Sequence, residues 1–112
     1  MTVREMVRAM QTEMRHPGLL PERAREILVQ LSSLYGNCLD EMREADHAYS
    51  VVLLQCLDAN EAANRAKIRA QISPEYQRKR EASDIAELVL ESIRSIKVVL
   101  KSLESEMREL HR

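Results

Sequence analysis

A dense group of basic side chains surrounds a single aromatic residue between positions 65 and 80. Six residues in this stretch are Lys or Arg and only Glu75 is acidic, so the local excess is five positive charges. Tyr76 lies between the two basic groups, where its ring could stack on an unpaired base while the cations neutralise phosphates. The predicted nucleic-acid-binding residues are Arg65, Lys67, Arg69, Tyr76, Arg78, Lys79 and Arg80.

The charge of the whole chain does not by itself identify the partner of this cluster. The 112 residues carry a net charge of −1, so an acidic excess elsewhere balances the basic stretch. No motif that reads base edges accompanies the cluster, and any nucleic-acid binding is therefore expected to have little sequence specificity. A basic turn can also be a solvated surface that balances acidic neighbours, and this interpretation stays open from the sequence alone.

Catalytic and metal-binding chemistry finds little support in the sequence. None of the three histidines, His16, His47 and His111, has a suitable partner at helical spacing. Cys38 and Cys56 are too far apart on one helix to form a disulfide within it, and they are interpreted as small buried hydrophobes in a reducing compartment. Gly-rich phosphate loops and nucleophile elbows are absent from the sequence. We expect a protein that is not an enzyme and that needs no metal or cofactor.

A heptad pattern predicts the helices that position the basic cluster. Thirteen uncharged residues recur alternately three and four residues apart, which is the period of a helix with an apolar seam against a partner helix. A second pattern of this kind runs from Ala82 to Leu110. The sequence therefore predicts an all-α fold. The first seam consists of Leu28, Leu31, Tyr35, Cys38, Met42, Ala45, Tyr49, Val52, Cys56, Ala59, Ala63, Ala66 and Ala70.

Capping residues and prolines set the expected helix boundaries. Thr2 fits an N-cap with Glu5 three residues later, and Ser73 followed by Pro74 fits the end of one helix and the start of another. The stretch with Pro17, Gly18 and Pro21 is typical of a linker. The predicted elements of a single helical domain, 1–112, are a helix over 1–16, a linker over 17–21, a long helix over 22–72 and a third helix over 74–111.

Two heptad helices joined by a short turn fold back antiparallel, so we expect a long, coiled-coil-like helical hairpin with the basic cluster at its tip. With the turn near residue 73, the numbers of facing residues sum to about 146, which places Met42 opposite Leu103 to Met107.

The third helix carries more apolar residues than one seam requires. The surplus is expected to be covered by the first helix, by other subunits or by both, and a homo-oligomer is predicted. The Met-rich first helix could also serve as a docking arm for a partner protein. The predicted oligomerisation residues are Ile85, Leu88, Val99, Leu103 and Met107.

No membrane partner is expected. The longest apolar run, Tyr49 to Leu54, is far too short to span a bilayer, and the N-terminus lacks the apolar region of a signal peptide. The sequence therefore predicts a soluble, cytoplasmic protein.

The run AANRAKIRAQISPEYQRKREAS, followed by an apolar helix that ends in EMREL, resembles the core of UvsY-type recombination mediators of phages. The resemblance covers roughly residues 45–110. It implies a small helical protein that binds single-stranded DNA through a basic hairpin, forms rings and helps load a recombinase onto strands coated by single-strand-binding protein. By position, it implies DNA contacts from Lys67, Arg69, Tyr76, Arg78 and Lys79.

We therefore predict an oligomeric recombination accessory protein that binds single-stranded DNA non-specifically through the hairpin tip, with a recombinase and a single-strand-binding protein as further partners. One alternative is a protein-only coiled-coil adaptor, chaperone or inhibitor whose basic tip docks on an acidic partner. A second alternative is a structural component of a phage or bacterial assembly.

Overall fold

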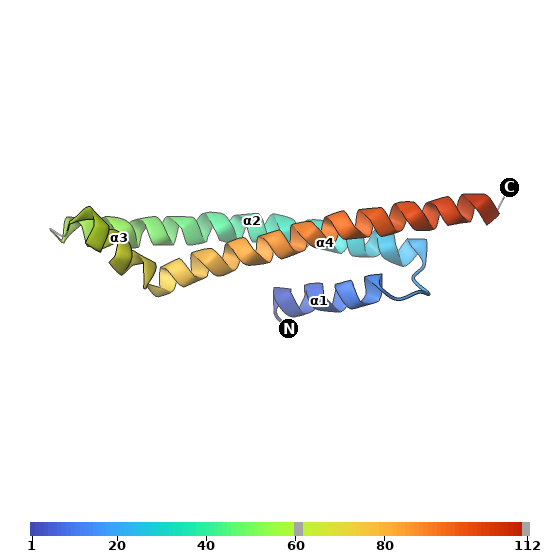
Figure 1. Ribbon diagram of the computed structural model, residues 1–112, viewed down its shortest axis with the longest axis horizontal. Coiled ribbons are helices and arrows are strands. Elements are labelled where there is room, and N and C mark those ends of the chain that lie inside the picture. Colours follow the sequence, from blue (N-terminus) through green and yellow to red (C-terminus); the bar gives the residue numbers. More distant parts are fainter. Residues whose placement is uncertain (60–61, 111–112) are drawn as a thin grey trace. The chain divides into compact units, whose positions relative to one another are not determined.

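The computed structural model describes residues 1–59 and 62–110, and every regular element within these ranges is a helix (Figure 1). The prediction of an all-α fold is confirmed. The helices are α1 (Val3–Met14), α2 (Pro21–Asp58), α3 (Ala63–Gln71) and α4 (Pro74–Leu110).

The helix starts follow the capping residues. The Thr2 hydroxyl accepts a hydrogen bond from the Glu5 backbone N–H at 3.1 Å, and the Ser73 hydroxyl accepts one from the Tyr76 backbone N–H at 3.2 Å. Each bond satisfies a donor that the first turn of a helix leaves unpaired. Pro21 and Pro74 are the first residues of α2 and α4, where the missing proline N–H costs nothing.

The prediction of one helix over 22–72 is wrong. Helix α2 ends at Asp58, and α3 begins at Ala63 after Ala62, whose backbone is extended (φ −57°, ψ 142°). Asp side chains compete for nearby backbone hydrogen bonds, and α2 ends at Asp58. The seam here offers only alanine, which contributes little burial energy to carry a helix across unfavourable residues.

The helices contribute to two compact units. The first, here called the α1 unit, comprises Met1–Gly36 and Glu87–Arg112, and the second, the α3 unit, comprises Asn37–Ala86. Helix α1 lies in the first unit and α3 in the second. Helices α2 and α4 are each divided between the two units.

Branched and long apolar side chains form the core of the α1 unit. Full burial of each such side chain is worth about 1.5–3 kcal/mol. Gln11 and Met14 of α1 line a small cavity together with Val99, one of the surplus apolar residues of α4, so α1 lies against part of this surplus. The buried apolar residues are Val7, Met14, Ala24, Ile27, Leu31, Val89, Ile93 and Ile96.

One buried polar residue joins α1 to α4 inside this unit. The Ser92 side chain is 1% exposed, and its hydroxyl donates to the Leu88 carbonyl at 2.9 Å and accepts from Gln11 Nε2 at 3.0 Å. The hydroxyl is thus satisfied in both roles, which removes the cost of burying it.

The α3 unit has a core of smaller side chains. Of the seam residues in this unit, only Ala59 and Ala63 are exposed, and these two flank the end of α2 and the start of α3. The heptad pattern therefore identified the inward face on both sides of the break. The buried residues are Cys38, Ala45, Tyr49, Ala66, Ala70, Ala82 and Ala86.

The predicted register of the antiparallel helices is also wrong. The numbers of facing residues add to 125 for the ring pair Tyr49 and Tyr76, and to 129 for the ion pair Arg25 and Glu104. The chain therefore reverses near residue 63, where α2 gives way to α3, and not at Ser73. Helix α3 lies on the returning side of the reversal, in the α3 unit.

Gly36 offers a test of the packing around α2. It is exposed in the middle of that helix, and a Cβ atom at this position would meet nothing within 4 Å. Gly36→Ala is expected to raise the free energy of unfolding by about 0.5–1 kcal/mol, because alanine loses less backbone entropy in a helix. Urea denaturation followed by circular dichroism measures this change.

Gly18→Ala is the control for this substitution. A Cβ there would approach the His16 imidazole to 3.2 Å, where His16 Nδ1 accepts the Gly18 N–H, so no gain is expected. If the Gly36→Ala protein is less stable than the parent, the conclusion that position 36 is exposed and uncrowded is wrong.

Candidate nucleic-acid interface

Helix α3 presents most of its surface to solvent. Ala66 and Ala70, four residues apart, form its buried face, and every other described residue from Ala63 to Arg69 is exposed. Arg65 and Lys67 are among the exposed residues, and neither pairs with a carboxylate in residues 1–59 or 62–110. These two cations are therefore available to an anionic partner.

Two isoleucines accompany the cations on the surface of this segment. Ile68 is 62% exposed and Ile72 is 78% exposed. Helical spacing places Arg65 and Ile68 opposite the face formed by Ala66 and Ala70. Neither isoleucine is among the residues predicted from the sequence, although the seam through positions 66 and 70 already places position 68 on the outer face.

The cations of α4 have a different environment, because carboxylates of α2 face them. Arg78 donates to both oxygens of Glu41, at 2.5 and 3.3 Å, and its Nη2 lies 3.5 Å from Glu44 Oε2. Lys79 Nζ lies 3.7 Å from Asp46 Oδ1. We call Glu41, Glu44 and Asp46 the acidic ladder. Arg78 and Lys79, which belong to the predicted DNA-binding residues, are therefore already paired with carboxylates within the protein.

The Arg78–Glu41 pair perturbs the titration of both groups. The hydrogen bond from Arg78 lowers the pKa of Glu41 below its ordinary value, and the same bond raises the pKa of Arg78. Both charges persist at neutral pH, and the carboxylate competes directly with any phosphate that approaches the guanidinium.

Tyr76 is one of two adjacent aromatic rings that are flanked by a cation on each side. Its ring centroid lies 5.3 Å from that of Tyr49, with 47° between the ring planes. Lys79 Nζ lies 4.7 Å from the Tyr49 centroid, and Arg80 Cζ lies 6.0 Å from the Tyr76 centroid. Tilted ring pairs and cations over ring faces are both favourable arrangements. Tyr76, which is half-buried, thus already packs against Tyr49 and Arg80.

The structure therefore divides the predicted site residues into two groups within the α3 unit. Arg65, Lys67 and Arg69 are exposed on α3, whereas Tyr76, Arg78, Lys79 and Arg80 lie at the start of α4 and, apart from Arg80, contact α2 directly. The ladder was missed because the expected register placed Met42, and with it Glu41, opposite the other end of α4.

The predicted oligomerisation residues are mostly half-covered within the chain. Ile85, Leu88, Val99 and Leu103 are half-buried, and Met107 is 46% exposed. Homo-oligomerisation through them stays a prediction.

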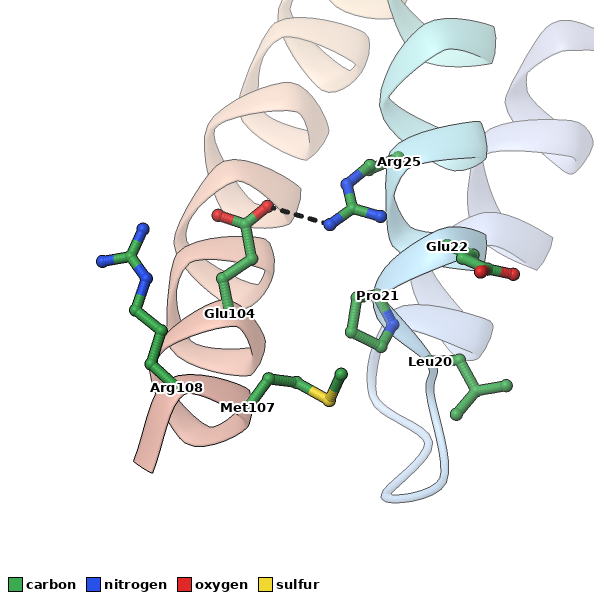
Figure 2. A pocket seen from close by; sticks show the side chains of 7 residues that line it. All are labelled: Leu20, Pro21, Glu22, Arg25, Glu104, Met107 and Arg108. Carbon is green, nitrogen blue, oxygen red and sulfur yellow. Dashed lines mark hydrogen bonds and ion pairs between the residues drawn. The ribbon is translucent and has the colours of Figure 1, made fainter. Parts of the chain in front are cut away.

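The α1 unit has an open cleft of about 590 Å³ beside the start of α2. Figure 2 shows the Met107 side chain extending toward Pro21, while Arg25 and Glu104 point at one another and form an ion pair at 3.3 Å. The cleft is lined by the apolar residues Leu20, Pro21 and Met107 and by the charged residues Glu22, Arg25, Glu104 and Arg108.

The described residues contain neither a cluster of metal-ligand side chains nor a helix that could span a membrane. The described part of the chain has no group of three or more His, Cys, Asp or Glu side chains that could hold a metal ion. Within the same residues, no helix combines the length and apolar character needed to cross a bilayer.

Comparisons with protein-family models, with curated proteins and with solved structures find no match to this chain. The resemblance to UvsY-type mediators accordingly stays a prediction.

Two lowered carboxyl pKa values predict how stability depends on pH. Hydrogen bonds from Arg23 and from Arg78 lower the pKa of Glu13 and of Glu41, respectively. A carboxyl group whose pKa is lower in the folded than in the unfolded protein stabilises the fold at pH values above its unfolded-state pKa, near 4.3. This stabilisation is lost as the pH falls through the folded-state pKa. The melting temperature should therefore fall as the pH is lowered from about 5 to about 3.

Glu13→Gln/Glu41→Gln tests the origin of this loss. The double variant should melt below the parent at pH 7, and the gap should close toward pH 3, whereas Glu22→Gln/Glu106→Gln, at exposed carboxylates, should follow the parent. A gap that is the same at pH 7 and pH 3 would show that the ion pairs are not responsible.

Proposed function

We propose that this protein binds single-stranded DNA without sequence specificity through the outer face of α3 and acts as a recombination accessory factor. The observation that carries the proposal is the presence of two exposed cations, Arg65 and Lys67, without a carboxylate partner in the described part of the chain. The resemblance to recombination mediators gives the biological setting.

The exposed isoleucines fit a single strand better than a duplex. Unpaired bases present apolar faces, which can pack on Ile68 and Ile72 while neighbouring phosphates contact the two cations. In a duplex these base faces are stacked and inaccessible. Bases are therefore expected to contact the surface of α3 and not Tyr76, which packs on Tyr49.

A protein partner is the second candidate, and the same isoleucines favour it. Exposed apolar side chains flanked by cations also match an acidic, partly apolar protein surface. In that case the protein is an adaptor, chaperone or inhibitor, and α3 is its docking helix.

Neutralising the α3 cations tests the first candidate. Arg65→Gln/Lys67→Gln should weaken binding to labelled oligo-dT by about tenfold or more in low salt, because two phosphate contacts are lost. The slope of log affinity against log salt concentration should become shallower by about 1.4, from roughly 0.7 per contact. Fluorescence anisotropy at several salt concentrations measures both quantities.

Lys101→Gln/Arg108→Gln is the matched control, because it removes the same residue types from exposed positions of the α1 unit. This control should bind nearly as well as the parent. If the parent does not bind oligo-dT at low salt, single-stranded DNA is not the ligand and the protein-docking alternative is favoured.

Removing the isoleucine side chains separates apolar contacts from ionic ones. Ile68→Ser/Ile72→Ser should weaken oligo-dT binding by about fivefold and leave the salt slope unchanged, since apolar contacts release no counterions. The exposed positions should leave the free energy of unfolding within about 0.5 kcal/mol of the parent. Equal affinity of this variant and the parent would exclude base packing on α3.

A further inference from the structure

The acidic ladder pairs with the two basic residues that open the second half of the basic stretch, Arg78 and Lys79. Arg78 and Lys79 follow α3 closely in the chain and belong to the same compact unit, but Glu41, Glu44 and Asp46 hold them. The cations of the two helices therefore differ in their partners. Arg65 and Lys67 on α3 have no carboxylate partner among the described residues, whereas Arg78 and Lys79 on α4 each have one or more.

We propose that the acidic ladder is a built-in competitor for phosphate, which masks a second anion site at Arg78 and Lys79 and thereby limits the affinity for a strand. This inference rests on the proposed function. A strand first contacts Arg65 and Lys67 on α3, and it reaches Arg78 and Lys79 only by displacing the ladder carboxylates.

The geometry makes the competition direct. Arg78 donates hydrogen bonds to Glu41 from two nitrogen atoms, Nε and Nη2. A guanidinium binds a phosphate with the same two-pronged geometry. A phosphate at this site therefore takes the place of the Glu41 carboxylate. Glu44 and Asp46 remain nearby and repel the phosphate over a range of about 8–10 Å.

The ion pairs are weak enough for the mask to open. The Arg78 and Lys79 side chains are 43% and 41% exposed, and the ladder side chains are 45–72% exposed. Exposed pairs of this kind contribute little to stability, so a phosphate can replace a carboxylate without unfolding the unit. The ladder thus weakens binding in a graded manner.

The positions of the cations do not depend on the ladder alone. Lys79 also lies over the Tyr49 ring, and Tyr76 packs on Tyr49 from the preceding turn of α4. These contacts keep the start of α4 against α2 when the carboxylates are neutralised. Removal of the ladder charges should therefore uncover the second site and leave the fold intact.

The test compares oligo-dT binding by the full chain and by Glu41→Gln/Glu44→Gln/Asp46→Asn. The ladder variant should bind about tenfold tighter at 0.1 M salt, and its salt slope should be steeper than that of the parent by about 1.4, because two more phosphate contacts form. Fluorescence anisotropy measures both values, and circular dichroism checks that the variant is folded. If the triple variant does not fold, Glu41→Gln alone should give about a threefold gain.

Two further variants separate the mask from a general charge effect. Glu22→Gln/Glu106→Gln/Glu109→Gln changes the net charge by the same amount at exposed positions of the α1 unit, and it should leave the salt slope unchanged. Adding Arg78→Gln/Lys79→Gln to the ladder variant should abolish the gain, because the uncovered cations are then absent.

The outcomes distinguish this inference from the proposed function. If Arg65→Gln/Lys67→Gln abolishes binding but the ladder variant binds no tighter than the parent, the mask is refuted and the α3 interface stands. An equal gain in the ladder variant and its net-charge control also refutes the mask. If neither the parent nor the ladder variant binds oligo-dT, both the proposed function and the mask are refuted.

Discussion

The point at which α2 ends determines which charges of the α3 unit meet. Helix α2 stops at Asp58, and the chain reverses near residue 63, so Tyr49 faces Tyr76 and the carboxylates one to two turns before Tyr49 face Arg78 and Lys79. Had α2 continued to residue 72, the same cations would lie opposite a different part of the helix. The ion pairs, the ring stack and the exposure of α3 all depend on this early reversal.

The two units achieve burial by different means. In the α1 unit, residues such as Ile27, Leu31 and Ile96 are fully buried, which supplies ordinary apolar burial energy. In the α3 unit alanines dominate the core, and each alanine buries little area. Side-chain interactions between α2 and α4, namely the tyrosine pair and its cations, therefore carry a larger share of the cohesion there.

Local signals in the sequence were sufficient to predict much of the fold. Thr2, Ser73 and the prolines mark helix starts through backbone hydrogen bonding, and the heptad seam marks the buried face through its period. The break after Asp58 was not predicted, because the uninterrupted spacing of alanines continues across it. Register depends on where the chain reverses, so this one local error displaced every predicted contact between α2 and α4. The basic residues of the candidate site were found from composition, but their carboxylate partners could not be found without the register.

Pairing within the chain matters more for function than the number of basic residues. Six cations between positions 65 and 80 suggest a uniform basic surface, yet the fold gives some of them carboxylate partners and leaves others open to solvent. A cation already hydrogen-bonded to a carboxylate gains little from a phosphate, because one charge-assisted bond replaces another. An unpaired cation gains the whole interaction and releases a counterion. The side chains that distinguish a ligand-binding surface from a balanced one are therefore those without a carboxylate partner. Between positions 65 and 80, Arg65 and Lys67 on α3 have no such partner among the described residues, and exposed isoleucines lie beside them.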